Sequence, residues 1–340
     1  MKKILFVVLM LGSCLLVAEP RKWKGPRPKF IVIGTTVHKG AGFFCEVQKV
    51  LIDLIHFDQQ GILALAPDWR HPFYPFKDHQ DENGWDLFFE SIPQDPCSVE
   101  GVTVNKIVVP WNEWHEIHGR FCTAQWVLYD QYLPYREYVH SIMKKYFKVK
   151  DHITAQLNQF YKENMEGHYC IGVHIRFAAV HAFEVPGGKH PSLEEYCAEI
   201  DQLIIQKQHL PIKIFLATDS NYVVQVLKMR YKNLLYYAEA PRSIGAEDPV
   251  FSLPLKNLDL FNQKRPGYKA GLYVLLDGLT LSKCDVMIHT TSNFASLVSF
   301  FNPYIKSIYL PKGFDPVCII QGQEDQNEVK NPFLNKLAAA

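Results

Sequence analysis

Three apolar segments in the second half of the chain end in polar side chains. The segments cover residues 170–176, 212–219 and 285–289, and they have the composition of buried parallel strands. The polar side chains at or directly after their ends are His174, Arg176, Asp219, Thr290, Thr291 and Ser292. Because open α/β folds bind their ligands at the carboxyl ends of parallel strands, we expect these side chains to form a binding site.

These residue types suit a nucleotide diphosphate. Arg176 is permanently charged and presents a rigid fork of donors. The hydroxyl run at 290–292 precedes an expected helix, so its hydroxyls and free backbone N–H groups make an anion site. Asp219 and Asp277 are suited to ribose hydroxyls or to the N–H groups of a base. Taken singly, each feature also has a simpler explanation, such as a solvated strand end or an ordinary helix cap.

Strands and helices alternate along the chain, which predicts an α/β fold with a parallel sheet and helices on both faces. The expected strands are 30–34, 62–66, 170–176, 212–219, 234–237, 285–289 and 307–311, and the expected helices are 44–57, 135–147, 152–164, 193–204, 222–231, 271–283 and 293–301. We expect an N-terminal lobe over 27–150, a nucleotide-binding lobe over 151–315 with a cleft between the two lobes, and a tail over 316–340.

Composition and missing motifs exclude several classes of protein. The net charge is +1 and no long basic run occurs, which argues against a nucleic-acid partner. No Gly-x-Gly-x-x-Gly or Walker loop follows a strand, which weakens dehydrogenase and NTPase interpretations. The chain has no Asp-x-Asp pair and no Cys-x-x-Cys pair, so we expect neither a metal-held diphosphate nor a structural zinc site.

Residues 1–18 have the charged start, apolar core and small-residue end of a signal peptide. Cleavage after Ala18 would give a soluble exported protein. Alternatively, the segment ending at Cys14 resembles a lipobox, whose cysteine is acylated. A third alternative is an uncleaved anchor, although the apolar stretch is short for a full span. We therefore expect export, with membrane association through the N-terminus under the second and third alternatives. Loss of Cys14 with the signal leaves seven cysteines, so at least one thiol stays free or pairs between chains.

The order and spacing of these motifs resemble the GDP-fucose-dependent α-1,6-fucosyltransferases. The resemblance rests on a Gly-rich loop at 39–43, His-x-Arg at 174–176, Ala-Thr-Asp at 217–219, and Asp-x-x-x-x-Thr-x-Ser at 285–292. It extends from about residue 30 to residue 311. Glu184, ten residues after His174, lies where that family places its proposed catalytic acidic residue.

The resemblance implies a GT-B-type fold with two Rossmann-like lobes and inverting, metal-independent transfer of fucose from GDP-fucose to a glycan hydroxyl. It implies no cofactor beyond the donor substrate. Glu184 would deprotonate the acceptor oxygen, while Arg176 and the amides near Ser292 would stabilise the charge on the leaving GDP. Asp277 and His174 would recognise the guanine, and Asp219 would support the site.

The sequence also departs from the family pattern next to the His-x-Arg motif. Phe177 replaces a second arginine, and Ala179 and Val180 replace an aspartate and a lysine. These changes leave open an exported pseudoenzyme, or a carbohydrate-binding protein that keeps the fold without turnover.

Overall fold

The computed structural model describes residues 31–34, 43–59, 64–68, 83–90, 128, 130–176, 191–237, 267–290 and 292–310. The expected signal segment, the Gly-rich loop before Phe43 and the C-terminal tail lie outside the described residues. Within the described part, no helix is long and apolar enough to cross a membrane.

Two parallel sheets form the framework. The larger sheet has the strand order β5-β4-β3-β6-β7, and all its neighbouring strands are parallel. Its strands are β3 (Tyr169–Ile175), β4 (Ile212–Thr218), β5 (Leu235–Tyr236), β6 (Val286–His289) and β7 (Lys306–Tyr309). The smaller sheet pairs β1 (Ile31–Gly34) with β2 (Ala64–Asp68). The prediction of an α/β fold with parallel strands is confirmed.

The alternation of side chains along β3 divides the larger sheet into two faces. Ile171, Val173 and Ile175 belong to one apolar cluster, whereas Cys170 belongs to another. Because successive side chains of a strand point to opposite faces, His174 lies on the same face as Cys170.

Helices α7 (Leu193–Gln206) and α8 (Asn221–Tyr231) cover the face that bears Ile171 and Val173. A capping box starts α7: the Ser192 hydroxyl accepts from the Glu195 amide, and the Glu195 carboxylate accepts from the Ser192 amide. A serine also caps α8 (Ser220). These caps satisfy backbone N–H groups that the helices themselves leave unpaired.

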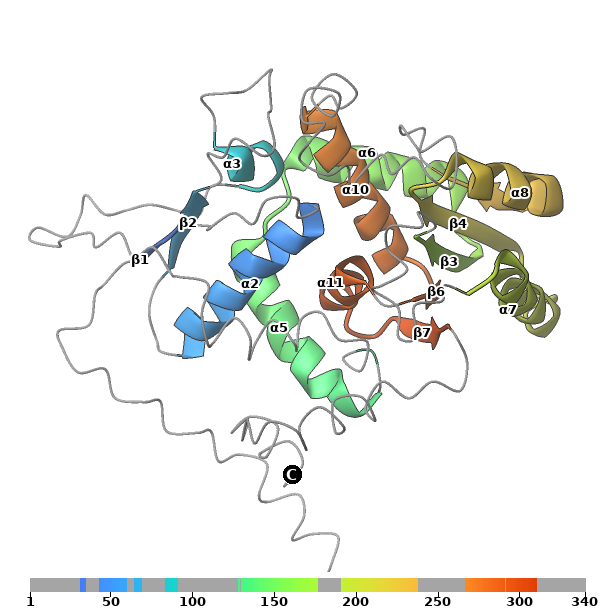
Figure 1. Cartoon of the computed structure of the whole chain (residues 1–340), viewed down its shortest axis with the longest axis horizontal. Coiled ribbons are helices and arrows are strands. Elements are labelled where there is room, and N and C mark those ends of the chain that lie inside the picture. The colour runs from blue at the N-terminus through green and yellow to red at the C-terminus, as the bar shows by residue number, and fades with distance from the viewer. Residues whose placement is uncertain are drawn as a thin grey trace, which may run out of the picture.

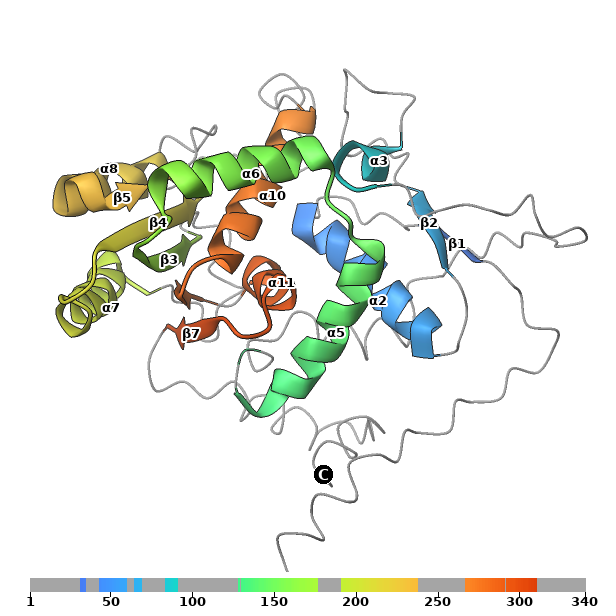
Figure 2. The ribbon, with the colours of Figure 1, turned by 180° about the vertical axis from the view of Figure 1, so that it is seen from behind.

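The opposite face is covered by α6 (Asp151–Asn164), α10 (Gly267–Ser282) and α11 (Asn293–Phe301). Figures 1 and 2 show α10 and α11 between the larger sheet and the helices α2 (Phe43–Gln59) and α5 (Leu133–Tyr146). The short helix α3 (Gly84–Phe88) and the 3-10 turns Asp130–Tyr132 and Lys232–Leu234 complete the described elements.

Gly172 allows α10 to approach the centre of the sheet. A Cβ atom at this position would lie 2.7 Å from Leu281 Cδ2 and 3.1 Å from Cys284 Sγ. A side chain here would therefore push α10 away from β3.

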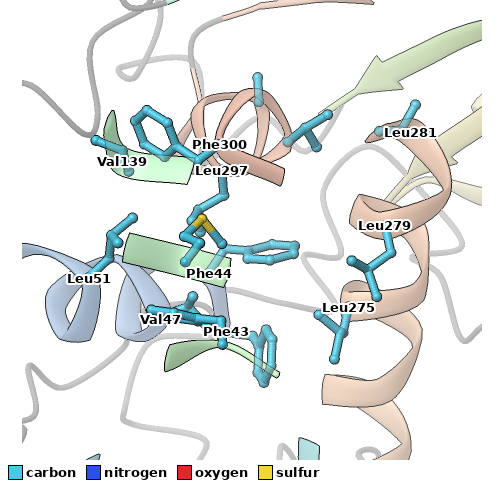
Figure 3. Packing of buried hydrophobic residues seen from close by; sticks show 14 of the residues in the cluster. Phe43, Phe44, Val47, Leu51, Val139, Leu275, Leu279, Leu281, Leu297 and Phe300 are labelled. Carbon is cyan, nitrogen blue, oxygen red and sulfur yellow. The ribbon is translucent and has the colours of Figure 1, made fainter. Parts of the chain in front are cut away.

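One apolar cluster joins elements from both halves of the chain. Phe43, Phe44 and Val47 of α2 lie opposite Leu275 of α10 and Leu297 of α11 (Figure 3). The same cluster extends to α5, α6 and β6. The domain boundary near residue 150 stays a prediction, but the packing is continuous across it.

Three buried cysteines, Cys170, Cys197 and Cys284, are free thiols. Burial raises the pKa of Cys170 to about 12 and also raises that of Cys284. The thiols of Cys170 and Cys284 therefore stay protonated at neutral pH.

Candidate functional site

The sheet order creates a switch point between β3 and β6. From β3 the chain continues to β4 and β5 on one side, and then crosses to β6 and β7 on the other. Connections therefore leave β3 and β6 in opposite directions at their carboxyl ends. In open α/β sheets this is the usual place for a ligand.

The strand register brings the predicted polar residues to this edge. Ile175 pairs with Thr218, so Arg176 and Asp219 follow at the same level of the sheet. Val173 pairs with Ile288, which places Thr290 level with Ile175. The ends of β3, β4 and β6 thus lie together, as the sequence predicts.

His174 is buried beside the start of α11. Its Nδ1 atom lies 3.4 Å from the Ser292 hydroxyl, and the ring of Phe294 stacks on the imidazole with a centroid distance of 4.4 Å and an interplanar angle of 17°. Burial, then the charge of Arg176 and the influence of His289, lower the pKa of His174 to about 3. The imidazole is therefore neutral at physiological pH.

Ser292 caps α11 with the same hydroxyl group. Its oxygen accepts a hydrogen bond from the Ala295 amide at 3.0 Å, so the hydroxyl proton is available to His174 Nδ1. In the tautomer in which Nδ1 accepts this proton, the imidazole carries its own proton on Nε2. The positive end of α11 and an N–H donor on His174 then lie at the same corner of the sheet edge.

Arg176 lies directly after β3 and is half-buried. Its charge is close enough to depress the pKa of His174. The edge therefore combines a permanent cation with a helix N-terminus, as a diphosphate site requires.

Thr290 lies on the other face of the sheet edge, next to α7. It is almost fully buried, and its hydroxyl faces that of Tyr196. Burial raises the pKa of Tyr196, and the negative charge of Asp219 acts in the same direction, while the Thr290 hydroxyl opposes the change. Thr290 thus lies beside Tyr196, on the face of the sheet opposite His174.

Asp277 lies on α10, nearly buried, next to Gly278. A Cβ atom on Gly278 would lie 2.7 Å from Phe44 Cζ and 3.8 Å from Phe294 Cε2. This part of α10 therefore borders the ring that stacks on His174.

Several predicted residues cannot be placed by the structure. Glu184 and Thr291 lie outside the described residues, as do Phe177, Ala179 and Val180. In the part of the chain that the structure describes, no group of three or more His, Cys, Asp or Glu side chains is arranged to hold a metal ion.

Sequence reasoning missed two neighbours of His174. Phe294 lies two residues after Ser292, the last residue of the hydroxyl run. The available signal in the sequence was an aromatic residue in the first turn of a helix that follows a polar strand end. His289 ends β6, and it is fully buried, with Nδ1 2.9 Å from the Thr290 carbonyl and Nε2 2.6 Å from the Ser307 hydroxyl. Burial lowers the pKa of His289 to about 4.

Comparison with known proteins identifies a family model and a curated relative that match this chain. The family model NodZ, described as Nodulation protein Z, matches residues 120–328, more than half of the chain. Nodulation protein Z of Sinorhizobium fredii is 28% identical over 269 aligned residues, which cover 68% of this chain and 79% of the relative.

The comparison with solved structures found fucosyltransferase NodZ from Bradyrhizobium, with 17% identity and a TM-score of 0.48, covering 85% of this chain and 98% of that one. POFUT1 in complex with GDP-fucose has 13% identity and a TM-score of 0.46, covering 84% of this chain and 100% of that one. On the match to the family model, the chain belongs to the nodulation protein Z family.

Proposed function

We propose that the protein is a fucosyltransferase that transfers fucose from GDP-fucose to a hydroxyl of a glycan. The observation that carries the proposal is the His174–Ser292 pair at the N-terminus of α11, at the switch point of the sheet, in a chain of the nodulation protein Z family. NodZ itself is described as an α-1,6-fucosyltransferase in a structure soaked with GDP-fucose. The two parallel sheets accord with the GT-B-type arrangement, in which the acceptor enters between the lobes.

The reaction has one bond formed and one broken at the anomeric carbon. The acceptor oxygen attacks this carbon from the face opposite the diphosphate, the bond to the β-phosphate oxygen breaks, and GDP leaves with the electron pair. Glu184 takes the acceptor proton in this proposal. Attack from the opposite face inverts the configuration of the anomeric carbon.

Arg176 and the start of α11 stabilise the departing GDP. The guanidinium is permanently charged, and the first backbone N–H groups of α11 lie at the positive end of the helix. Both act on negative charge that grows as the bond breaks, so they lower the barrier rather than only binding the donor. This arrangement neutralises the diphosphate without a divalent metal ion.

Neutral His174 suits recognition of the guanine. A protonated imidazole would donate from both nitrogens, whereas a neutral ring that accepts from Ser292 at Nδ1 keeps Nε2 as its one donor for the guanine. In the proposal Asp277 accepts from the guanine N–H groups on the α10 side, and Asp219 supports the end of β4.

Calorimetry of GDP and GDP-fucose binding in the presence of EDTA tests the donor site, with Arg176→Ala as the variant. We expect binding that survives EDTA and is lost or reduced by at least tenfold in the variant. Lys228→Ala, at an exposed position in the last turn of α8, is the matched control because it also removes a cation and should bind normally. Failure of the unchanged protein to bind either nucleotide would contradict the proposed function.

A glycan array with GDP-fucose as donor then tests turnover, with Glu184→Gln as the variant. We expect the variant to bind GDP normally and to transfer no fucose. Binding of GDP without transfer by the unchanged protein would favour the pseudoenzyme, for which the substitutions at Phe177, Ala179 and Val180 are the motivating observation.

We also propose that residues 1–18 direct export. The mass of the mature protein decides between the alternatives, because cleavage before an acylated Cys14 and cleavage after Ala18 leave different N-termini. A full-length cytoplasmic product would contradict export.

A further inference from the structure

Phe294 connects the candidate donor site to the first half of the chain. It is the second residue of α11, two positions after the Ser292 cap. One side of its ring is stacked on His174, at 4.4 Å and 17°. Because Ser292 contacts the edge of the same imidazole, the ring of His174 is held from its face and from its edge by the same helical turn.

The ring of Phe294 is in turn supported by α2. Phe44 packs edge-on against it, with a centroid distance of 4.9 Å and an interplanar angle of 82°. One turn further along α2, Gln48 Nε2 donates a hydrogen bond of 3.1 Å to the Asn293 carbonyl. Two adjacent side chains of α2 thus fix the first turn of α11.

Gly278 of α10 leaves the space that this arrangement needs. Its missing Cβ would lie 2.7 Å from Phe44 Cζ, so a larger residue would displace the phenyl ring. The contacts therefore form a continuous series from α2 and α10, through Phe294, to His174.

We propose that Phe294 is a positioning residue of the donor site: it holds the His174 imidazole in the plane that faces the Ser292 hydroxyl, and it makes that plane depend on α2. His174 is buried and its Nδ1 lies 3.4 Å from the Ser292 hydroxyl, so a rotated ring would lose this contact and would also turn Nε2 in another direction. The consequence for GDP rests on the proposed function, whereas the effect on His174 does not.

The test uses the full chain labelled with 15N-histidine, and its readouts are the ring-nitrogen signals of His174 and calorimetric GDP binding. His174→Gln identifies the signals. Phe294→Leu keeps an apolar side chain but removes the aromatic face, so we expect displaced His174 signals and GDP binding weaker by about 2- to 10-fold, the factor that an aromatic pair contributes. Phe294→Tyr keeps the face and should preserve both readouts.

Phe300→Leu is the matched control. Phe300 lies on the same helix, is fully buried, and makes an edge contact with Tyr135 at 6.2 Å. Its replacement should lower the free energy of unfolding without displacing the His174 signals or changing GDP affinity. The proposal is overturned if Phe294→Leu leaves the His174 signals unchanged, or if Phe300→Leu displaces them equally.

A second variant keeps the test decisive if Phe294→Leu does not fold. Phe44→Leu leaves the stacked ring in place but removes its support, so we expect a smaller displacement of the same His174 signals; unchanged signals would overturn the dependence on α2. Failure of the unchanged protein to bind GDP would contradict the proposed function, and the histidine spectra would still decide the role of Phe294.

Discussion

At the scale of single residues, the Ser292 hydroxyl joins the cap of α11 to the imidazole of His174. Replacing Ser292 with alanine should lower the free energy of unfolding by about 1 kcal/mol, the usual contribution of a serine cap, and should also weaken GDP binding. Ser192→Ala removes the cap of α7, so it should lower stability similarly and leave GDP binding unchanged. Urea unfolding and calorimetry measure the two effects. Equal GDP affinities for the two variants would show that Ser292 does not contribute to GDP binding.

His174 also gives the stability of the protein a pH dependence of known sign. Its pKa is about 3 in the folded chain and near 6.5 when exposed, so between these values the unfolded state binds more protons. The stabilisation is complete above pH 6.5 and is lost as the pH falls towards 3. From pH 8 to pH 5 the loss from this one group is about 2 kcal/mol.

The variant His174→Gln lacks this titrating group. Between pH 8 and pH 5, the free energy of unfolding of the variant should therefore fall by about 2 kcal/mol less than that of the unchanged protein. Urea titrations at several pH values measure the difference. His209→Gln, at an exposed turn, is the control and should keep the pH dependence of the unchanged protein. Parallel curves for His174→Gln and the unchanged protein would contradict a buried neutral imidazole.

At the scale of elements, the close approach of α10 to β3 depends on Gly172. Alanine at this position should lower the free energy of unfolding by about 1–3 kcal/mol, because its Cβ would meet Leu281 Cδ2 at 2.7 Å. Leu281→Ala creates a cavity and costs about 2–5 kcal/mol alone. In the double variant the two changes compensate, so the loss measured by urea unfolding should be smaller than the sum. Strict additivity would show that the helix and strand do not meet at this point.

The helices and strands were largely predictable from the sequence, whereas the side-chain contacts between them were not. The alternation along β3 and the periodicity of α7 report which residues are buried, and both elements formed where these patterns predicted. The start of α10 was expected at Gly271 but lies at Gly267, and Gly271 lies inside the helix against Phe88. The stack of Phe294 on His174 joins residues 120 positions apart, and no local pattern encodes such a pairing.

For the whole molecule, one shared apolar cluster decides whether the two predicted lobes unfold separately. Trp85 of α3, Phe44 of α2 and Phe300 of α11 belong to one apolar cluster, which also contains Met287 of β6. Since this cluster spans the predicted boundary near residue 150, unfolding either half would expose apolar surface of the other. We therefore expect a single cooperative transition.

The distribution of tryptophan makes this expectation testable without labels. All six tryptophans precede residue 127, and Trp85 among them lies in the shared cluster, whereas every strand of the larger sheet follows residue 168. Urea unfolding followed by fluorescence and by amide hydrogen exchange of β3 and β4 should give the same free energy, because both report the loss of one core. Phe300→Ala, in the shared cluster, should lower both values by about 3–5 kcal/mol. If fluorescence changed at lower urea than the exchange of β3, each half would have a core sufficient for its own stability, and the Phe44–Phe294 contact would join two independent lobes.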